Sequence, residues 1–443
     1  MTERVPFTPA STLGRAYLLY RQRLILAAPV MPFVEVEVLD KLARLSGDHP
    51  TAAFAEASGT LGTLLADPTL ATDPEKQRTF EMSYEAAKLA AFPATSAYLA
   101  ECAKLSGMTQ DLSLNAIDLS TLRVIDEKAH SDPALKTFVG QLRAKLEEVR
   151  SAPDAQAYAQ FFEIYGEAIV MLLLRERKVQ VKRLAETNTS MPDFECETDD
   201  GKQFFIEVKS LDVVDGIYRH KEMLNDALES EVEHERQARK GKRITTSERE
   251  IAPYRKSGTD SAYDPPSLNR VIDTLRSKWR RAFKSSQFAQ GPTFALAVVD
   301  RLVLPAAQQD LAPYYFDDAL DGGGSSGVLW QAAFGREGGL VLRRPDFAGK
   351  PGVEGVLTAP GIFVDDTQSF DAAGIIVLDV HCGQRLALGL ASPRSISDDW
   401  TNDDTEGVLV SFCDFWNDAD HSRGFELATD RDLARVPGTK TSG

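Results

Sequence analysis

The 443-residue sequence contains few cysteines and no long apolar run. Its four cysteines, Cys102, Cys196, Cys382 and Cys413, form no Cys-x-x-Cys pair, which argues against a structural zinc site and favours reduced thiols, as in a cytoplasm. The best candidate for a membrane segment, residues 169–174, is far shorter than the roughly 20 residues that a membrane helix needs. The sequence also begins without the pattern of a signal peptide. We therefore expect a cytoplasmic protein with no membrane segment.

Metal-binding histidine clusters and a P-loop are also missing. The six histidines are spread along the chain, and no glycine-rich loop has the Gly-Lys-Ser/Thr ending of a P-loop. The composition is otherwise that of a globular protein, with 43% hydrophobic and 26% charged residues. The sequence therefore predicts a folded protein, and gives no support to an ATPase of the P-loop class.

Charge is distributed unevenly along a chain whose net charge is −16. Between Arg236 and Lys284 there are 14 Lys and Arg against 5 Asp and Glu, whereas from Asp365 to the end there are 15 Asp and Glu against 6 Lys and Arg. The basic central segment could present a positive face to phosphates, and its residues 236–243 could close over a nucleic-acid backbone. A solvated charged face with no ligand explains the same pattern.

Hydrophobic periodicity predicts three regions. Residues 1–155 show apolar residues at three- and four-residue spacing and predict a helical N-terminal domain. Residues 156–300 predict helix, strand, strand, strand, helix, strand, interrupted by a charged insertion at 219–260, and this order indicates an α/β fold around a mixed sheet. Residues 301–443 predict a β-rich, acidic C-terminal region whose strands could complete that sheet. One of these strands is expected at "GVLVSF", residues 407–412.

The stretch "MPDFECETDDGKQFFIEVKS", residues 191–210, predicts a β-hairpin. Asp199-Asp200-Gly201 is suited to a three-residue turn, because glycine accepts the left-handed conformation that such a turn needs. Closing the hairpin there pairs Thr198 with Lys202. A bulge at Gly201 would shift this pairing by one residue.

Counting outward from the turn places Asp193 directly opposite Glu207, and opposed residues point to the same face of a sheet. Lys209, two residues beyond Glu207, shares that face, whereas Ile206 and Val208 face the core. Two adjacent carboxylates repel each other, and Mg²⁺ would remove the repulsion by taking one or two carboxylates together with waters and a substrate phosphate. Asp193, Glu207 and the backbone carbonyl of Val208 are therefore the predicted metal ligands, and Lys209 would supply a positive charge beside them.

A further carboxylate is expected from the helix that precedes the hairpin. Glu163 and Glu167 are four residues apart, so they share one helix face. Glu167 is the preferred catalytic or ligand residue, because it lies nearer the strands, and Glu163 is the alternative. An ordinary exposed helix glutamate remains an equally good explanation of either.

Met191-Pro192-Asp193-Phe194, followed by Ile206-Glu207-Val208-Lys209-Ser210, resembles the PD-(D/E)xK nuclease superfamily. The resemblance covers roughly residues 157–300, and it implies a restriction-endonuclease-like core. It implies hydrolysis of phosphodiester bonds by a water that Mg²⁺, or Mn²⁺ in its place, activates. DNA is the implied partner in preference to RNA, and a homodimer is compatible with such an enzyme.

The same resemblance implies roles for individual residues. Asp193 would match the motif aspartate, Glu207 the second acidic ligand, Lys209 the motif lysine and Glu167 the glutamate of the first helix. Ser210 suits the polar position that often follows the lysine. Two alternatives remain: a non-catalytic nucleic-acid-binding or regulatory protein that keeps the fold, and a purely structural hairpin with a surface salt bridge.

Basic residues near these elements are the candidates for phosphate contacts. Lys182 and Arg183 lie on the first strand, and Lys278 and Arg281 lie on the second helix of the core. Trp279, which stands among the latter, is expected to pack in the core rather than to stack on a base.

Overall fold

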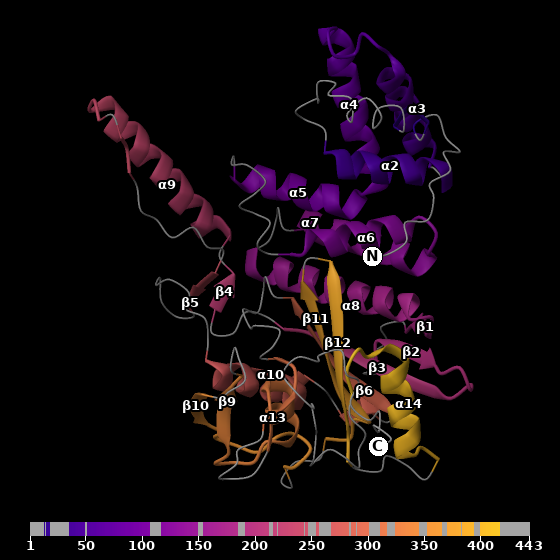
Figure 1. Ribbon diagram of the computed structural model, residues 1–443, viewed down its shortest axis with the longest axis vertical. Coiled ribbons are helices and arrows are strands. Elements are labelled where there is room, and N and C mark those ends of the chain that lie inside the picture. Colours follow the sequence, from indigo (N-terminus) through magenta and orange to yellow (C-terminus); the bar gives the residue numbers. More distant parts are fainter. Residues whose placement is uncertain are drawn as a thin grey trace. The chain divides into compact units, whose positions relative to one another are not determined.

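A computed structural model gives the fold (Figure 1). It describes residues 13, 15–17, 35–48, 51–106, 117–148, 154–184, 191–211, 216–218, 220–242, 244–246, 254–256, 267–282, 285–288, 290–300, 311–316, 324–344, 352–365, 370–381, 383–393 and 399–416. The chain forms two compact units, Met1–Lys104 with Leu122–Glu147, and Leu105–Thr121 with Glu148–Gly443. In this division residues 105–121 belong with the second unit.

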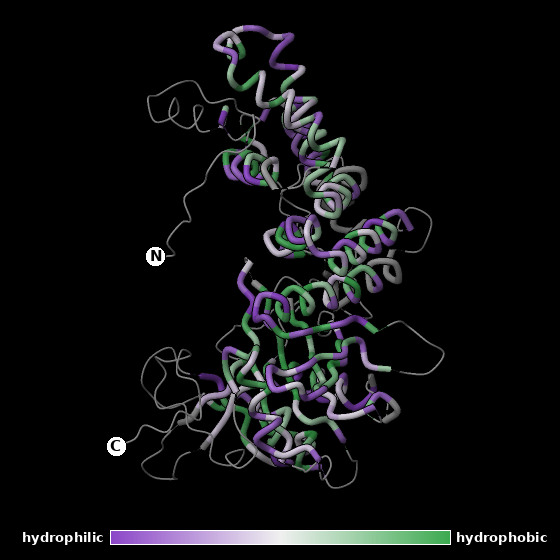
Figure 2. The backbone as a smooth tube through the Cα atoms, turned by 90° about the vertical axis from the view of Figure 1, so that its right-hand side faces the viewer, coloured by the Kyte–Doolittle hydropathy of each residue, from purple (hydrophilic) through white to green (hydrophobic). Residues whose placement is uncertain are grey.

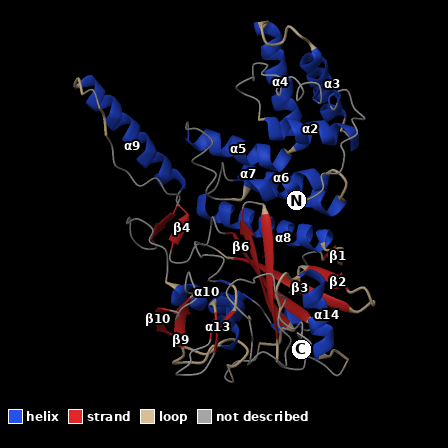
Figure 3. Ribbon diagram, viewed as in Figure 1, coloured by secondary structure: helices blue, strands red, loops and turns tan. Residues whose placement is uncertain are grey.

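The first unit is helical, as its periodicity predicts (Figure 3). Its helices are α2 (Val36–Asp48), α3 (Ala52–Ala66), α4 (Pro74–Ala91), α5 (Pro93–Ser106), α6 (Leu119–Ala129) and α7 (Pro133–Glu148). The first residues of α6, before Leu122, belong to the second unit. Local signals fix two of the helix starts: the side chain of Thr51 caps α3, and Asp73 caps α4 immediately before Pro74. Aromatic residues such as Phe54, Phe80 and Tyr84 fill its core.

The start of α5 is capped from a distance by Asp126 on α6. The Asp126 carboxylate accepts hydrogen bonds from the backbone N–H groups of Ala94 (3.0 Å) and Thr95 (2.8 Å) and from the Thr95 hydroxyl (2.7 Å). Asp126 is buried, and burial raises its pKa to about 6. The carboxylate therefore satisfies helix-start donors that water cannot reach.

Replacing Asp126 by alanine is expected to destabilise the first unit by several kcal/mol, because each buried donor left without an acceptor costs about 1–3 kcal/mol. Urea unfolding measures the loss. Asp132→Ala is the matched control, since Asp132 caps α7 through Ala134 (2.9 Å) at a more accessible helix start, where losing a cap costs about 1 kcal/mol. Equal losses for the two variants would contradict the buried role of Asp126.

The second unit is built on α8 (Asp154–Glu176) and a six-stranded mixed sheet. The sheet strands are β1 (Gln180–Arg183), β2 (Phe194–Glu197), β3 (Gln203–Ser210), β6 (Thr293–Asp300), β11 (Gly374–His381) and β12 (Gln384–Ala391). Their order is β1-β2-β3-β6-β11-β12, with β3, β6 and β11 parallel and the other neighbours antiparallel. The predicted order of helix, three strands, helix and strand is confirmed, and β11 and β12 extend the sheet as the C-terminal strands were expected to.

Helices cover both faces of this sheet, and its central strands are hydrophobic along most of their length (Figure 2). On one face, the Ser210 hydroxyl donates a hydrogen bond to the Phe162 carbonyl of α8 (3.0 Å). Gly166 allows this approach, since a Cβ there would collide with the Ser210 side chain. On the other face, α10 (Leu268–Ala282) and α13 (Val328–Phe334) pack on alternate residues of β6 and β11 in one apolar core. Trp279 is fully buried in that core, as expected.

The remaining elements lie outside the main sheet. The charged insertion at 219–260 contains α9 (His220–Arg239) and β5 (Tyr254–Lys256), and β4 (Gly216–Tyr218) directly precedes it. The others are α11 (Ser285–Phe288), β7 (Tyr314–Phe316), β8 (Gly324–Ser326), β9 (Leu340–Arg343), β10 (Gly352–Val356) and α14 (Asn402–Phe412). β4 pairs with β5, β7 with β8, and β9 with β10, each as a two-stranded sheet.

The strand predicted at residues 407–412 is wrong, because these residues form the second half of α14. A capping box starts this helix: the Thr401 side chain accepts from the Asp404 N–H (3.3 Å), and the Asp404 side chain accepts from the Thr401 N–H (2.8 Å). Its buried residues, Thr405, Val408, Leu409 and Phe412, have helical spacing. The described part of the C-terminal region therefore contains the helices α13 and α14 besides its six strands.

Residues 117–121 are held to the second unit by Asp118. Its carbonyl accepts a hydrogen bond from the Tyr165 hydroxyl of α8 (3.1 Å), and its carboxylate accepts one from the Gly383 N–H (2.5 Å) in the turn between β11 and β12. These long-range contacts have no local sequence signal, which explains why the sequence places this segment in the helical domain. Among all described helices, none combines the length and the apolar character needed to cross a bilayer.

Candidate functional site

The hairpin register brings Asp193 and Glu207 together as predicted. Phe194 pairs with Ile206 and Glu197 with Gln203, and the turn closes with the Thr198 N–H donating to the Lys202 carbonyl (2.9 Å). Gly201 has a φ of 84°, so it takes the left-handed conformation that the turn requires. The next position outward in this register places Asp193 opposite Glu207, and no bulge displaces it.

Asp193 lies at the open end of the hairpin, immediately before β2, and hydrogen bonds to its backbone carbonyl and to its side chain hold it there. Its carbonyl accepts a hydrogen bond from the Leu184 N–H (2.9 Å), and its Oδ2 accepts one from the Val208 N–H (2.7 Å). Burial raises the pKa of this carboxyl, and the Lys209 charge and the Val208 N–H oppose the rise. The Asp193 carboxylate therefore lies against β3 at the level of Glu207 and Val208.

Glu207 is the most buried ionisable group of the site, with 1% of its surface exposed. Its Oε1 accepts hydrogen bonds from the Lys209 ammonium and from the Gln287 amide. Its Oε2 is buried and accepts no hydrogen bond from any described residue. Burial raises the pKa of Glu207 to about 7, and the neighbouring Asp193 charge adds to the rise. A divalent cation could bind the buried Oε2 of Glu207 and offset the repulsion between this carboxylate and Asp193.

Lys209 shares the face of Glu207 and is 27% exposed. Burial opposes its charge, but the charges of Glu207, Asp193 and Glu163 outweigh burial and raise its pKa. The ammonium is therefore protonated at neutral pH and stands between the buried carboxylate and solvent. Ser210, the next residue, points to the α8 face and has a packing role there.

The two glutamates of α8 have different surroundings. Glu167 binds Arg183 through a 2.6 Å ion pair, and both side chains are largely buried. Arg183 also lowers the pKa of Asp193, so this pair lies beside the hairpin carboxylates. Glu163 is exposed, and its charge raises the pKa of Lys209. Both glutamates therefore border the site, and their roles as metal ligands stay predictions, with Glu167 already engaged by a cation.

Gln287 is the site residue that the sequence analysis misses. It lies on the four-residue helix α11, 80 positions after its partner Glu207, and 6% of it is exposed. A lone glutamine in "SSQF" carries no motif, so no local pattern identifies it. Its contact depends on the crossover that brings β6 beside β3.

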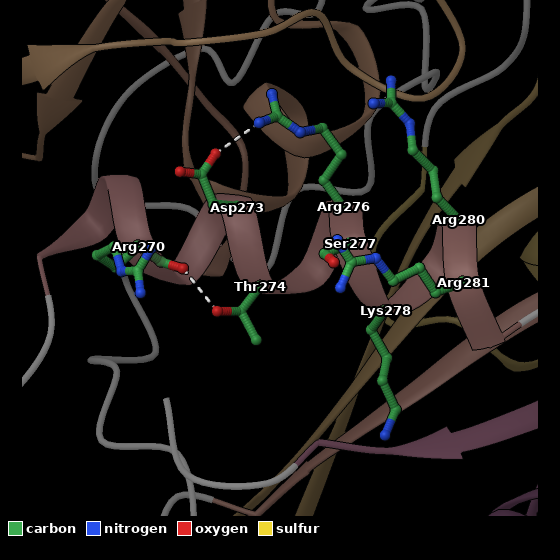
Figure 4. A pocket seen from close by; sticks show the side chains of 8 residues that line it. All are labelled: Arg270, Asp273, Thr274, Arg276, Ser277, Lys278, Arg280 and Arg281. Atoms are coloured by element: carbon green, nitrogen blue, oxygen red, sulfur yellow. Dashed lines mark hydrogen bonds and ion pairs between the residues drawn. The ribbon is translucent and has the colours of Figure 1, made fainter. Parts of the chain in front are cut away.

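The four predicted phosphate contacts fall into two groups. Lys182 is 74% exposed on β1 and forms a 3.3 Å ion pair with Glu195, whereas Arg183 points inward to Glu167 and is the weaker candidate. Lys278 and Arg281 lie on α10 at a hollow of about 820 Å³ that side chains of this helix line (Figure 4). Neither Lys278 nor Arg281 forms an ion pair or a hydrogen bond through its side chain within the part of the chain that the structure describes.

Of the three other arginines that line that hollow, Arg276 and Arg280 bind acidic side chains. Arg276 binds Asp273 (2.6 Å) and the carbonyl of Ala359, and Arg280 binds Asp365. Figure 4 shows Arg276 and Arg280 on one side of α10 and Lys278 on the other. Among the described residues that line the hollow, the cations open to an anionic ligand are therefore Lys278 and Arg281.

No protein-family model matches this sequence, and comparisons with curated proteins and with solved structures gave no significant match. The chemistry of the site therefore follows from its own residues.

Proposed function

We propose that this protein is a metal-dependent nuclease with a restriction-endonuclease-like core, which hydrolyses phosphodiester bonds in DNA within the cytoplasm. The observation that carries the proposal is the buried Oε2 of Glu207, which accepts no hydrogen bond from any described residue and belongs to a carboxyl group in hydrogen-bonding contact with Asp193, with the Lys209 ammonium on the same face. A buried carboxylate pair with one open oxygen suits a hard cation such as Mg²⁺.

The strand topology supports this proposal. A restriction-endonuclease-like core requires an antiparallel three-strand meander that is followed, through a helix, by a strand parallel to the third. Strands β1, β2 and β3 form the meander, and β6 follows α10 and pairs in parallel with β3. The motif residues lie on β3 and just before β2, at the expected positions in that topology.

Asp193 and Glu207 would hold the cation, with the Val208 carbonyl as a third oxygen. The described residues contain no cluster of three or more His, Cys, Asp or Glu side chains suited to a metal. Two carboxylates nevertheless fit Mg²⁺, which keeps several waters and takes the rest of its shell from substrate phosphate. When bound, the cation would neutralise phosphate charge and make water a better nucleophile.

Lys209 would act directly on the substrate side of the site. Its ammonium is partly exposed and protonated, so it can stabilise the negative charge that develops on phosphorus oxygens or hold the attacking water in place. The Arg183 charge lowers the pKa of Asp193 and would favour its ionised form, and Glu167 would hold Arg183 in place.

A cleavage panel tests the proposal. Purified protein is incubated with linear, circular and single-stranded DNA and with RNA, in Mg²⁺, in Mn²⁺ and in EDTA, beside the Asp193→Asn variant. We expect wild-type cleavage of DNA that needs a divalent cation and that the variant loses. Binding of DNA without cleavage in any metal would instead identify a non-catalytic nucleic-acid-binding protein.

The α10 cations are expected to contact the substrate backbone. Glu207 and Lys209 neighbour Ala295 and Ala297 in the sheet, and these alanines belong to the apolar core that α10 covers, so α10 and the site share one face. Replacing Lys278 and Arg281 together by glutamine should weaken DNA binding and flatten its dependence on salt. The log–log slope should fall by about 0.9 for each phosphate that the variant no longer neutralises.

The salt dependence is measured by fluorescence anisotropy on labelled DNA in Ca²⁺ or EDTA, so that no substrate is cut. Lys136→Gln, at an exposed position of α7, is the control for a general change of charge. A slope that stays at the wild-type value in the double variant would remove α10 from the interface.

A further inference from the structure

The lysine and the amide that donate to Glu207 reach the same oxygen, and the further hydrogen-bonding contact of this carboxyl group is with the Asp193 carboxyl group. Oε1 accepts from the Lys209 ammonium and from the Gln287 amide, while Oε2 accepts from no described residue. A carboxylate offers about four lone-pair sites, two on each oxygen. Two donors therefore occupy the capacity of Oε1, and the capacity of Oε2 stays open in a position where only 1% of the residue is exposed.

The fold holds Gln287 in place at the C-terminal end of α11. The Thr293 hydroxyl at the start of β6 lies 3.3 Å from the Gln287 carbonyl and 2.9 Å from the Gly291 carbonyl, so it can donate to either, and Thr293 itself is fully buried. The ring of the next residue, Phe288, packs edge-on against Phe370, with ring centroids 5.6 Å apart. The Gln287 amide therefore reaches Glu207 from an anchored backbone, and its side chain is buried as well.

We propose that Gln287 is a positioning residue of the metal site, an inference that rests on the proposed function. The Gln287 amide and the Lys209 ammonium together occupy Oε1 of Glu207, and this leaves Oε2 to bind the divalent cation. Lys209 is partly exposed to solvent, whereas Gln287 is neutral, buried and anchored. Gln287 would therefore keep the Glu207 carboxylate in its orientation when the Lys209 ammonium contacts a substrate phosphate. Partners of this kind fix the orientation of metal-binding carboxylates in proteins generally.

The test compares Mn²⁺ binding by the wild type and by Gln287→Met, a variant of nearly the same shape with no hydrogen-bond donor. Isothermal titration calorimetry is expected to show affinity for Mn²⁺ reduced by roughly 10- to 100-fold, the usual effect of losing an outer partner of a metal ligand. Gln290→Met is the matched control, because Gln290 is an exposed glutamine three residues further on and should bind Mn²⁺ as the wild type does.

Cleavage kinetics then separate positioning from substrate contact. At saturating Mn²⁺, the Gln287→Met variant should recover most of the wild-type kcat, and its KM for DNA should stay unchanged. Unchanged Mn²⁺ affinity in a Gln287→Met protein with a lowered unfolding temperature would show a merely structural role and overturn the proposal.

Further outcomes test the role of Gln287 separately from the nuclease activity. Should Gln287→Met fail to fold, Gln287→Asn keeps the amide but withdraws it from Glu207, and the same loss of Mn²⁺ affinity is expected. If the wild type binds Mn²⁺ and cleaves no substrate, the nuclease proposal fails, while the effect of Gln287 on Mn²⁺ affinity still decides its own role. A wild type that binds no Mn²⁺ would overturn both.

Discussion

Replacing Glu207 by glutamine is expected to abolish cleavage and, without metal, to make the protein more stable at alkaline pH. Cleavage should fall by more than roughly 100-fold, because even an indirect partner of a bound metal contributes about 10- to 100-fold, and Glu207 is a proposed direct ligand. The opposite effect on stability distinguishes this residue from a structural one, whose loss would lower activity and stability together.

The expected gain in stability follows from the pKa of Glu207. Burial and the Asp193 charge raise this pKa from 4.5 to about 7 in the folded chain. A group whose pKa rises on folding stabilises the fold below its unfolded pKa, and this contribution is lost as the pH rises through the folded pKa. The wild type therefore loses stability between about pH 4.5 and pH 7, and the neutral glutamine does not. One pKa unit corresponds to about 1.4 kcal/mol, so the variant should gain a few kcal/mol at alkaline pH.

Urea unfolding in EDTA at about pH 4 and about pH 8 measures this difference. The two proteins should unfold alike at the lower pH, where Glu207 is protonated, and the variant should be more stable at the higher pH. Glu197→Gln, at an exposed position of the same hairpin, is the control and should show no pH-dependent gain. A Glu207→Gln variant that is less stable than the wild type at the higher pH would show that the Glu207 carboxylate is already well satisfied without a metal.

Replacing Lys209 by methionine is expected to remove cleavage even when metal is saturating. Lys209 donates to Glu207 Oε1 and is not placed as a ligand, so the variant should still bind Mn²⁺, although more weakly because Oε1 loses one donor. Its ammonium is the partly exposed positive charge of the site, and loss of a group that stabilises developing charge lowers kcat by roughly 10²- to 10³-fold.

Single-turnover cleavage at increasing Mn²⁺ separates this effect from that of Gln287. The Gln287→Met variant should recover with metal, whereas Lys209→Met should not. Lys202→Met is the matched control, because Lys202 lies at the turn of the same hairpin and binds Asp404 rather than the site. Recovery of Lys209→Met at high Mn²⁺ would reduce Lys209 to a second positioning residue.

The hairpin could be predicted in detail because its determinants are local. Gly201 can take a positive φ without strain, and a turn closed there leaves one register in which apolar residues such as Ile206 enter the core. Once the register is set, the meeting of Asp193 and Glu207 follows by counting. The same local logic predicts the helices of the first unit from their caps and periodicity.

Predictions that lacked a local determinant were less successful. Residues 407–412 are a short apolar run, which suits a strand or a helix equally well, and the deciding signal lies upstream in the capping box of Thr401 and Asp404. Ion-pair partners also depend on the tertiary fold. Arg183 therefore looks like a phosphate contact in the sequence, although it binds Glu167 in the structure.

Gln287 shows the limit of prediction most clearly. Gln287 lies on α11 and its partner Glu207 on β3, and the two meet only because β6 runs parallel to β3 after a long connection. No spacing rule links a buried amide to a carboxylate across such a crossover. A residue proposed to orient a site in this way is found from contacts and burial, whereas the proposed metal ligands are found from a motif.

Anomalous diffraction from crystals soaked in Mn²⁺ tests the central claim most directly, because it locates the metal independently of any substrate. The account predicts an anomalous peak in the wild type that Asp193 and Glu207 Oε2 share, and no peak there in crystals of Glu207→Gln. A wild-type structure without a peak between these two carboxylates, or a peak that survives the Glu207→Gln substitution, would contradict the account.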